Sequence, residues 1–274
     1  MSSYEGFPDS RTPEESIFVS NYLGKADLHI HSLANDGLAT PAEIVAYAEE
    51  HTDLNVIAIT DHDEIQGALE AREIVARGSY RLEVIVGMEV TTLEGHLLAL
   101  GIEQPIRLLL PLEKTIAAVH EQGGFVVIPH PLTFFTMGIR QQAINRLLRS
   151  RSPGVYIDGL EVFNPSFAGR IGHLKTLELN ETKWHLARCG GSDSHALHTI
   201  GSAYTVFPGR TAADLRRALA EKSTDFGGQF WSVADHTSIA APQVFRSIIV
   251  TPGMRLRKAA NWVWNEHIGP HLPP

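Results

Sequence analysis

The sequence predicts a single α/β barrel that is closed or nearly closed. Strand-like and helix-like stretches alternate along most of the chain, which is typical of a parallel sheet. The length of 274 residues is close to the roughly 250 that one such barrel takes. A hydrophobic content of 43% is ample for one large core. Polar clusters follow several of the expected strands, where such barrels carry their chemistry.

The first half of the chain is interpreted from helix caps and apolar runs, after a first strand around the two histidines of the segment DLHIH. Thr40 and Glu43 form a capping box with Pro41 at the first helical position, which predicts a helix to about Glu50. An apolar run at 55–60 predicts a strand buried on both faces. The other expected elements are a helix at 64–77, a strand at 82–86 and another strand, antiparallel or at an edge, at 97–100.

The second half continues the alternation. Gly123-Gly124 ends a helix over 113–122, as expected of a helix C-terminus. The further strands are expected at 125–128, 157–163, 188–191 and 204–207, and the further helices at 140–149, 172–187 and 212–221. An apolar run at 244–250 and a helix at 254–264 follow, which we interpret as a cover for the barrel or a dimer contact; a membrane-surface or nucleic-acid role is the alternative.

Charge and cysteine content restrict the class of protein. The net charge of −8 gives no general basic field for nucleic acid. The single cysteine, Cys189, allows no intramolecular disulfide and is interpreted as a small buried hydrophobe. The chain begins without a signal-peptide pattern, and no apolar run reaches the length of about 18 residues needed to span a membrane. A soluble, cytoplasmic protein is therefore expected.

Histidines and acids fall near the ends of the expected strands. His29 and His31 stand two apart in the first strand, so their imidazoles share a face. Two such imidazoles suit zinc, manganese or iron. Glu89 ends an apolar run, where a carboxylate can bridge two metals. Together nine residues predict one metal site: His29, His31, Asp36, His62, Glu89, His96, His130, Asp193 and His195.

The order of these motifs, DLHIHS, TDHD, GME, GHLLAL, IPHP and GSDSH, resembles the polymerase and histidinol phosphatase (PHP) family. The resemblance covers about residues 25–225, and the small stand-alone phosphoesterases fit best. It implies a distorted (β/α)7 barrel with a two- or three-metal phosphoesterase site. With the flanking segments, the expected organisation is an N-terminal extension (1–24), the PHP domain (25–225) and a C-terminal helical extension that packs on the barrel (226–274).

The resemblance also implies roles for the nine residues. His29, His31 and Asp193 would bind one metal, and Glu89 would bridge it to a second metal that His130 also binds.

The other four residues complete the implied set. His96 matches a histidine that many small members of the family use. Asp36, His62 and His195 match the ligands of a third metal. The cofactors expected are two or three divalent ions, of manganese, zinc or iron.

The expected reaction is in-line attack of a metal-bound hydroxide on phosphorus. Glu89 belongs to the catalytic set, and His195 or His62 would give the leaving group its proton through a metal-bound water. Arg140 and Arg170 are expected, on position alone, to hold the non-bridging phosphoryl oxygens, or else to be solvated helix charges. The substrate is a phosphomonoester or phosphodiester: a small metabolite, a mononucleotide or a short oligonucleotide.

Two other functions compete with this one. Amidohydrolases and deaminases also open with an H-x-H strand, but they commonly use a carboxylated lysine, and no lysine here stands at an expected strand end. A metal-stabilised binding module, or a subunit of a replication or repair complex, is the non-enzymatic alternative. Glu161, at another strand end, would either orient a ligand or help to bind substrate. The remaining histidines are interpreted as surface or cap residues, with His198 the one to watch.

Overall fold

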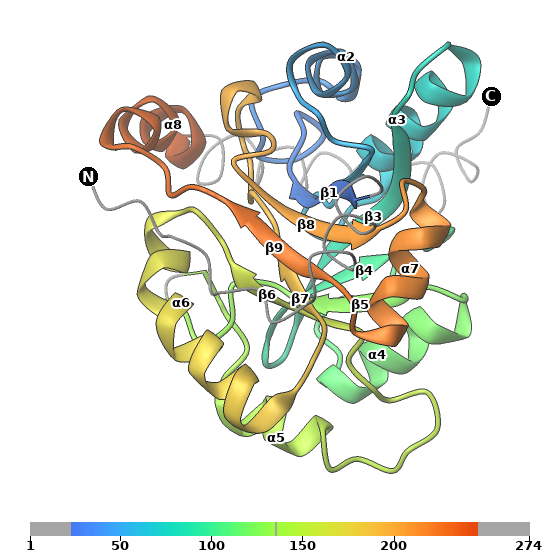
Figure 1. Cartoon of the computed structure of the whole chain (residues 1–274), viewed down its shortest axis with the longest axis vertical. Helices are drawn as coiled ribbons and strands as arrows, with labels where there is room; N and C mark the ends of the chain where they lie inside the picture. Colours follow the sequence, from blue (N-terminus) through green and yellow to red (C-terminus); the bar gives the residue numbers. More distant parts are fainter. Residues whose placement is uncertain (1–22, 135, 246–274) are drawn as a thin grey trace, which may run out of the picture.

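The computed structural model of the chain describes residues 23–134 and 136–245, and in this part nine strands form one sheet surrounded by helices (Figure 1). The strand order across the sheet is β7-β6-β5-β4-β3-β2-β1-β8-β9. The strands are β1 (Leu23–Ile30), β2 (Val56–Ile59), β3 (Glu83–Thr92), β4 (Gly95–Leu100), β5 (Phe125–Ile128), β6 (Gly159–Phe163), β7 (Arg188–Gly190), β8 (Ala203–Pro208) and β9 (Asp225–Gly228).

The helices follow the strands in the expected alternation. They are α2 (Pro41–His51), α3 (Gln66–Arg77), α4 (Leu112–Glu121), α5 (Gln141–Leu147), α6 (Phe167–Leu179), α7 (Ala212–Glu221) and α8 (Val233–Phe245), with the short turns η1 (Asn180–Trp184) and η2 (Leu197–Thr199). The predicted bounds of β5 and α7 are confirmed, and the predicted capping box of α2 is present. The predicted helix at 172–187 was wrong at both ends: α6 starts five residues earlier, because Ser166 caps it with its Oγ on the N–H of Gly169, and after Leu179 the chain passes into the π-helix η1, which ends at Trp184.

The sheet closes into a nearly complete barrel. Strands β1, β2 and β3 are parallel, as are β5, β6 and β7, and β4 runs antiparallel between the two sets. Beyond β7 the chain meets β1 again: the N–H of His31 donates to Ser194 O at 2.8 Å, and the N–H of Ser194 donates to His29 O at 3.2 Å. The strand β8 pairs with the other end of β1 through Leu23–Ala26. Because the chain after β7 returns to the first strand, the predicted barrel is confirmed.

The interior of the barrel is apolar at the end where α7 packs. Neighbouring residues alternate between two clusters: Val56 belongs to the inner one, and Ile57 belongs to the outer one under the helices. The inner apolar cluster draws residues from both halves of the chain: Ala26, Leu28, Val56, Ala58, Ile85, Leu98, Leu100, Phe125, Val127, Ala187, Cys189, Phe207, Leu215, Ala218 and Leu219. Polar groups that point inward must therefore lie towards the opposite end of the strands.

A bulge in β1 breaks the strict alternation on which the sequence analysis relied. Leu28 belongs to the inner apolar cluster, whereas Ile30, two residues later, belongs to the outer cluster. The register with β2 shifts between Asp27 and Ile30. Because a bulge adds one residue to a strand, His29 turns to the inside directly after Leu28.

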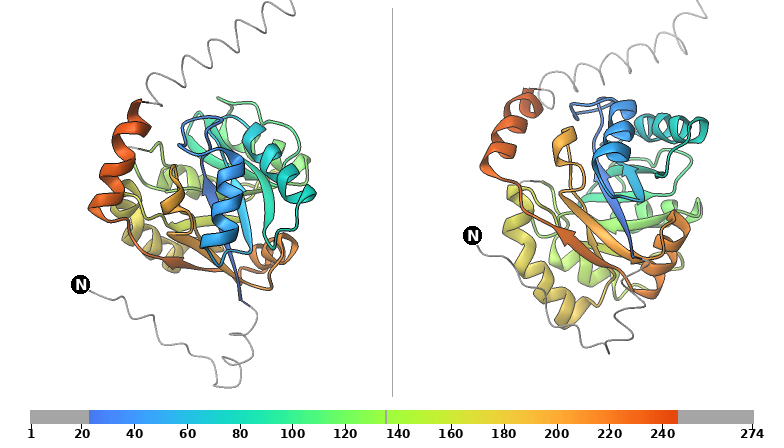
Figure 2. Two further views of the ribbon diagram at one scale, coloured as in Figure 1. Left: turned by 90° about the horizontal axis from the view of Figure 1, so that it is seen from above. Right: turned by 45° about the horizontal axis from the view of Figure 1, so that its top comes forward.

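The C-terminal part of the described chain begins inside the sheet. The strand β9 pairs with β8 in antiparallel register and crosses the expected domain boundary at residue 225. The helix α8 follows at the edge of the molecule (Figure 2). The predicted helix at 254–264 lies outside the described residues, as does most of the N-terminal extension. Within the described ranges no helix has both the length and the apolar character that a membrane span requires.

Candidate metal centre

The structure brings all nine predicted ligands together at one end of the barrel. His29, Glu89 and His96 lie in β1, β3 and β4, and the others follow the ends of strands. Eight of the nine are buried and His62 is partly exposed. Their ligand atoms form four overlapping groups, each within 4.8 Å: His31, Asp36, His62 and His195; His29, His130 and Asp193; His29, His31 and Glu89; and His62, Glu89 and His96.

Glu89 lies between two sets of imidazoles. Its Oε1 is 2.8 Å from His96 Nδ1 and 3.1 Å from His130 Nε2. Its Oε2 is 3.1 Å from His62 Nδ1 and 3.3 Å from His29 Nε2. The strand β3 runs to Thr92, beyond the predicted end at residue 86, so this carboxylate is held within a strand and not on a loop.

Two aspartates complete the other side of the centre. Asp193 Oδ1 is 3.3 Å from His31 Nε2, and Asp36 Oδ1 is 3.6 Å from His31 Nδ1. Asp36 Oδ2 is 3.4 Å from His195 Nε2. The rings of His31 and His195 stack with their centroids 4.2 Å apart.

The acids that flank His62 fix the loops around the centre, a role that the sequence analysis missed. Asp61 Oδ1 accepts from the N–H of Ser32 at 2.6 Å, which ties the end of β2 to the turn after β1. Asp63 Oδ1 accepts from the N–H of Thr91 at 2.8 Å and so ties the same loop to β3. Carboxylates on both sides of a histidine directly after a strand were the signal available.

Two ligand-bearing residues have strained backbone. The φ angles of His130 and Asp193 are 26° and 52°, values that residues with a side chain rarely adopt and that cost about 1–3 kcal/mol each. Hydrogen bonds on both sides hold His130 in place: its N–H donates to Glu161 Oε2 at 2.6 Å, and its carbonyl accepts from Thr133 Oγ1 at 2.7 Å. Strain of this kind is typical of functional sites.

The buried carboxylates of the centre are held in their charged form, which favours the binding of cations. Burial raises the pKa of Glu89, but the histidines around it, His62 first, outweigh burial and hold that pKa well below its usual range. Burial, helped by the charge of His195, lowers the pKa of His31 to about 4, so His31 is neutral at physiological pH. Burial also lowers the pKa of His195, but the nearby carboxylates, Asp36 first and then Asp193, raise it to about 9.

The donor set fits divalent metal ions. Both ring nitrogens of buried His31, and Nε2 of His195, have no hydrogen-bond partner among the described residues. In that same part of the chain, the ion-pair partners of Glu89 and Asp193 are all histidines. Buried carboxylates are stable when paired or bound to metal, and imidazole with carboxylate suits zinc, manganese and iron.

The two predicted substrate arginines lie outside this cluster. Arg140 is exposed and lines a cavity of about 870 Å³ that also includes Gly95 and Thr133, close in sequence to His96 and His130. Arg170 is exposed on α6, with its guanidinium carbon 5.0 Å from the centroid of the Phe230 ring. No described contact joins either arginine to the nine ligands.

Other polar groups singled out in the sequence have ordinary surroundings. Cys189 is buried, as predicted, and burial raises the pKa of its thiol to about 12. His198 is exposed, with Nε2 3.6 Å from Asp235 Oδ1 of α8. Lys25 lies near the start of β1, where its Nζ is 2.5 Å from Asp53 Oδ2. The lysines of the described residues otherwise lie on or next to helices, and none enters the ligand set.

Comparison with known proteins supports the same interpretation. Residues 27–188 match the family model for the PHP domain, and residues 180–224 match a model described as PHP-associated. An uncharacterised protein of Methanocaldococcus jannaschii is 32% identical over 168 residues, which are 57% of this chain and 90% of that protein.

Two further similarities differ in extent and in kind. The 5'-3' exoribonuclease Rnm of Salmonella typhimurium is 39% identical over 88 residues, 31% of this chain and 30% of that enzyme. A two-domain protein from Bacteroides vulgatus, described as containing a predicted PHP-like metal-dependent phosphoesterase, matches with a TM-score of 0.64 at 19% identity. The match covers 83% of this chain and 71% of that one.

Proposed function

The chain belongs to the PHP domain family, and from this premise we propose that it hydrolyses a phosphoester of a nucleotide or of the end of a short oligonucleotide. The reaction class is metal-dependent phosphoester hydrolysis. One observation carries the proposal: the two oxygens of Glu89 face two different sets of imidazoles, at 2.8 and 3.1 Å on one side and 3.1 and 3.3 Å on the other. A carboxylate in this position suits a pair of metal ions better than one ion.

We propose that the nine residues hold two or three divalent ions of manganese, zinc or iron. His29, His31, Glu89, His130 and Asp193 supply ligands for the first two positions. The group of His31, Asp36, His62 and His195 is suited to a third. When bound, such ions lower the pKa of coordinated water and polarise phosphoryl oxygens.

The proton for the leaving group is assigned to His62 or His195. The His62 side chain is 23% exposed and that of His195 is 6% exposed, so His62 is the more accessible to a substrate. An imidazole is suited to such transfers because its ordinary pKa lies near neutral pH. Burial lowers the pKa of His62, and the charges of Glu89 and Asp36 oppose that lowering only in part.

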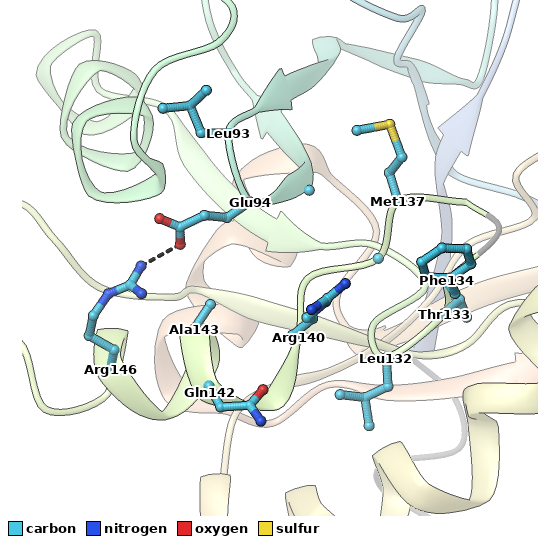
Figure 3. A pocket seen from close by; sticks show the side chains of 12 residues that line it. Leu93, Glu94, Leu132, Thr133, Phe134, Met137, Arg140, Gln142, Ala143 and Arg146 are labelled. Carbon is cyan, nitrogen blue, oxygen red and sulfur yellow. Dashed lines mark hydrogen bonds and ion pairs between the residues drawn. The ribbon is translucent and has the colours of Figure 1, made fainter.

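The cavity lined by Gly95, Thr133 and Arg140 is proposed to bind the rest of the substrate. Figure 3 shows Arg140 between the ion pair of Glu94 with Arg146 on one side and the Phe134 ring on the other. Phe134 is 80% exposed and lines the cavity, and an aromatic ring in this position suits stacking on a nucleobase. Arg140 has no ion-pair partner among the described residues and is free to contact a phosphate.

A substrate panel tests the proposal. The protein loaded with manganese is incubated with an aryl phosphate, a bis-aryl phosphate diester, a nucleoside monophosphate and a short RNA, and released phosphate or nucleotide is measured. We expect turnover of at least one nucleotide substrate and loss of activity in His29→Ala. Arg140→Met should raise KM for the nucleotide more than for the aryl phosphate, and Arg149→Met is the matched surface control.

Two outcomes would contradict the proposal. Full activity of His29→Ala would show that hydrolysis does not use this centre. Hydrolysis of a cyclic amide or release of ammonia, without phosphoester cleavage, would assign the chain to the amidohydrolase type of reaction.

A further inference from the structure

One buried carboxylate lies beside the nine ligands without belonging to them. Glu161, in β6, is 2% exposed. Its Oε1 is 3.1 Å from His29 Nδ1, on the opposite side of that ring from the nitrogen that faces Glu89. Its Oε2 accepts from the N–H of His130 at 2.6 Å and from Asn164 Nδ2 at 3.0 Å. Oε1 thus contacts the ring of one predicted metal ligand, and Oε2 contacts the backbone of another and the side chain of Asn164.

Asn164 extends this contact to a third strand end. Its Oδ1 accepts from Ser166 Oγ at 2.6 Å and from the N–H of Ser166 at 3.1 Å, so its Nδ2 is left to donate. That Nδ2 lies 3.0 Å from Glu161 Oε2 and 3.3 Å from Asp193 Oδ2. The amide orientation is therefore fixed by its partners, and it joins two carboxylates that would otherwise repel each other.

Two glycines make room for the pair. A Cβ at Gly191 would lie 2.2 Å from Glu161 Oε1, and a Cβ at Gly169 would lie 2.5 Å from Asn164 Oδ1. Real Cβ atoms do not approach other heavy atoms so closely, so any larger residue at these positions would displace the pair. The backbone at Gly191 and at Gly169 thus leaves the space that Glu161 and Asn164 occupy.

We infer that Glu161 and Asn164 are positioning residues for the metal centre, an inference that rests on the proposed function. Glu161 accepts the Nδ1–H of His29, which fixes the tautomer that leaves the Nε2 lone pair for a metal. It also holds the strained peptide of His130, and Asn164 orients Asp193. The pair connects ligands from β1, β5 and the segment after β7. Because both of its oxygens are already engaged by these partners, this role is favoured over substrate binding, the other role expected for Glu161 from the sequence.

The variant Glu161→Gln separates this role from a purely structural one. An amide side chain has one acceptor oxygen, whereas Glu161 accepts from three donors: the N–H of His130, the Nδ2–H of Asn164 and the Nδ1–H of His29. If the oxygen stays on His130, the amide NH2 faces His29 Nδ1 and favours the tautomer with a proton on Nε2, which cannot bind metal. We expect zinc affinity, measured by competition with a chelator, to fall about 10–100-fold with the number of bound ions unchanged.

Proton NMR of the zinc-loaded protein with 15N-labelled histidine gives an independent signature. In the unsubstituted protein the His29 Nδ1–H should give a slowly exchanging, downfield signal. In Glu161→Gln this signal should be lost or shifted upfield. The exposed Glu181→Gln, on η1, is the matched control and should change neither measurement. Asn164→Ala should weaken zinc binding less and leave the His29 signal in place, and it replaces Glu161→Gln if that variant does not fold.

Two outcomes would contradict the positioning role of Glu161. One fewer bound ion in Glu161→Gln would make Glu161 a ligand and overturn the inference, as would unchanged zinc affinity with an unchanged His29 signal. Neither measurement uses a substrate, so failure of the inference is distinguishable from failure of the proposed reaction.

Discussion

The interior of the barrel has two layers built from the same strands. In β3, Ile85 joins the inner apolar cluster and Glu89 the metal centre; in β4, Leu98 joins the cluster and His96 the centre. Alternation decides which residues face inward, and position along the strand decides whether they are apolar or ligands. The apolar cluster and the metal centre are therefore separated by only a few residues within one strand.

The layers differ in their energetics. The apolar layer gains free energy from burial, at roughly 25 cal/mol per Å² of apolar surface. The ligand layer contains two residues with strained backbone, which lowers stability, and buried carboxylates such as Glu89 whose charge the surrounding histidines stabilise. Mutations in the apolar layer should therefore act mainly on stability, whereas mutations in the ligand layer should act mainly on metal-dependent activity.

The largest effect is expected in the ligand layer, from Glu89→Gln. An amide cannot bridge two ions as a carboxylate does, so metal-dependent activity should fall by more than the roughly 10–100-fold typical of residues outside the first ligands. The urea midpoint of the metal-free protein at neutral pH should also fall, because the histidines hold the pKa of Glu89 below its usual range and so favour its charged form in the folded state. Activity after chelation and reloading, and urea unfolding after chelation, check this; full activity of the reloaded variant would contradict the assignment of Glu89 to the metal centre.

The next effect is expected in the apolar layer. Phe207 is fully buried in the inner apolar cluster. Phe207→Ala should lower the free energy of unfolding by about 3–5 kcal/mol while the folded fraction keeps its activity. Urea unfolding and activity per folded molecule test the prediction, with Leu174→Ala on the exposed face of α6 as control. If zinc affinity fell in parallel with stability, the two layers would not be independent.

The smallest effect is expected outside both layers. His120 lies with Nδ1 2.7 Å from Gly154 O and Nε2 2.9 Å from Asp158 Oδ2, both of them acceptors, so the charged imidazolium suits the site. Burial lowers the pKa of His120, but these partners outweigh burial and raise it. The stabilisation is therefore complete below the pKa of the unfolded chain and is lost as pH rises through the folded pKa.

His120→Gln should remove this part of the pH dependence, on the order of 1 kcal/mol, the net contribution of a hydrogen bond. Urea midpoints of both proteins between pH 6 and pH 9 measure it. Activity at fixed pH should not change, since His120 is remote from the ligands. An identical pH dependence in the two proteins would mean that His120 contributes nothing to it.

The sequence predicted the fold and the members of the nine-residue cluster better than the residues that support the cluster. Polar residues after apolar runs, taken in order, identified all nine clustered residues, because strand ends of a barrel converge. The bulge that turns His29 inward left no local signal, since it arises from pairing with β2. The bonds from Glu161 to His29 and His130 span 132 and 31 residues, so no local pattern could show which of its two expected roles applied. Arg140 and Arg170 were assigned from position alone, and loop conformation decides their reach.

The metal centre can form only after the backbone of Ser194 has paired with that of His29 and His31. These partners are 165 and 163 residues apart, so the closing bonds, and with them Asp193 and His195, join the site only after most of the chain has been synthesised. Contacts this distant in sequence form slowly, because the entropy of closing a long loop must be overcome first. A nascent chain that ends before Ser194 would carry most of the imidazoles and yet no finished centre, so loading with metal becomes a late event in the life of the polypeptide.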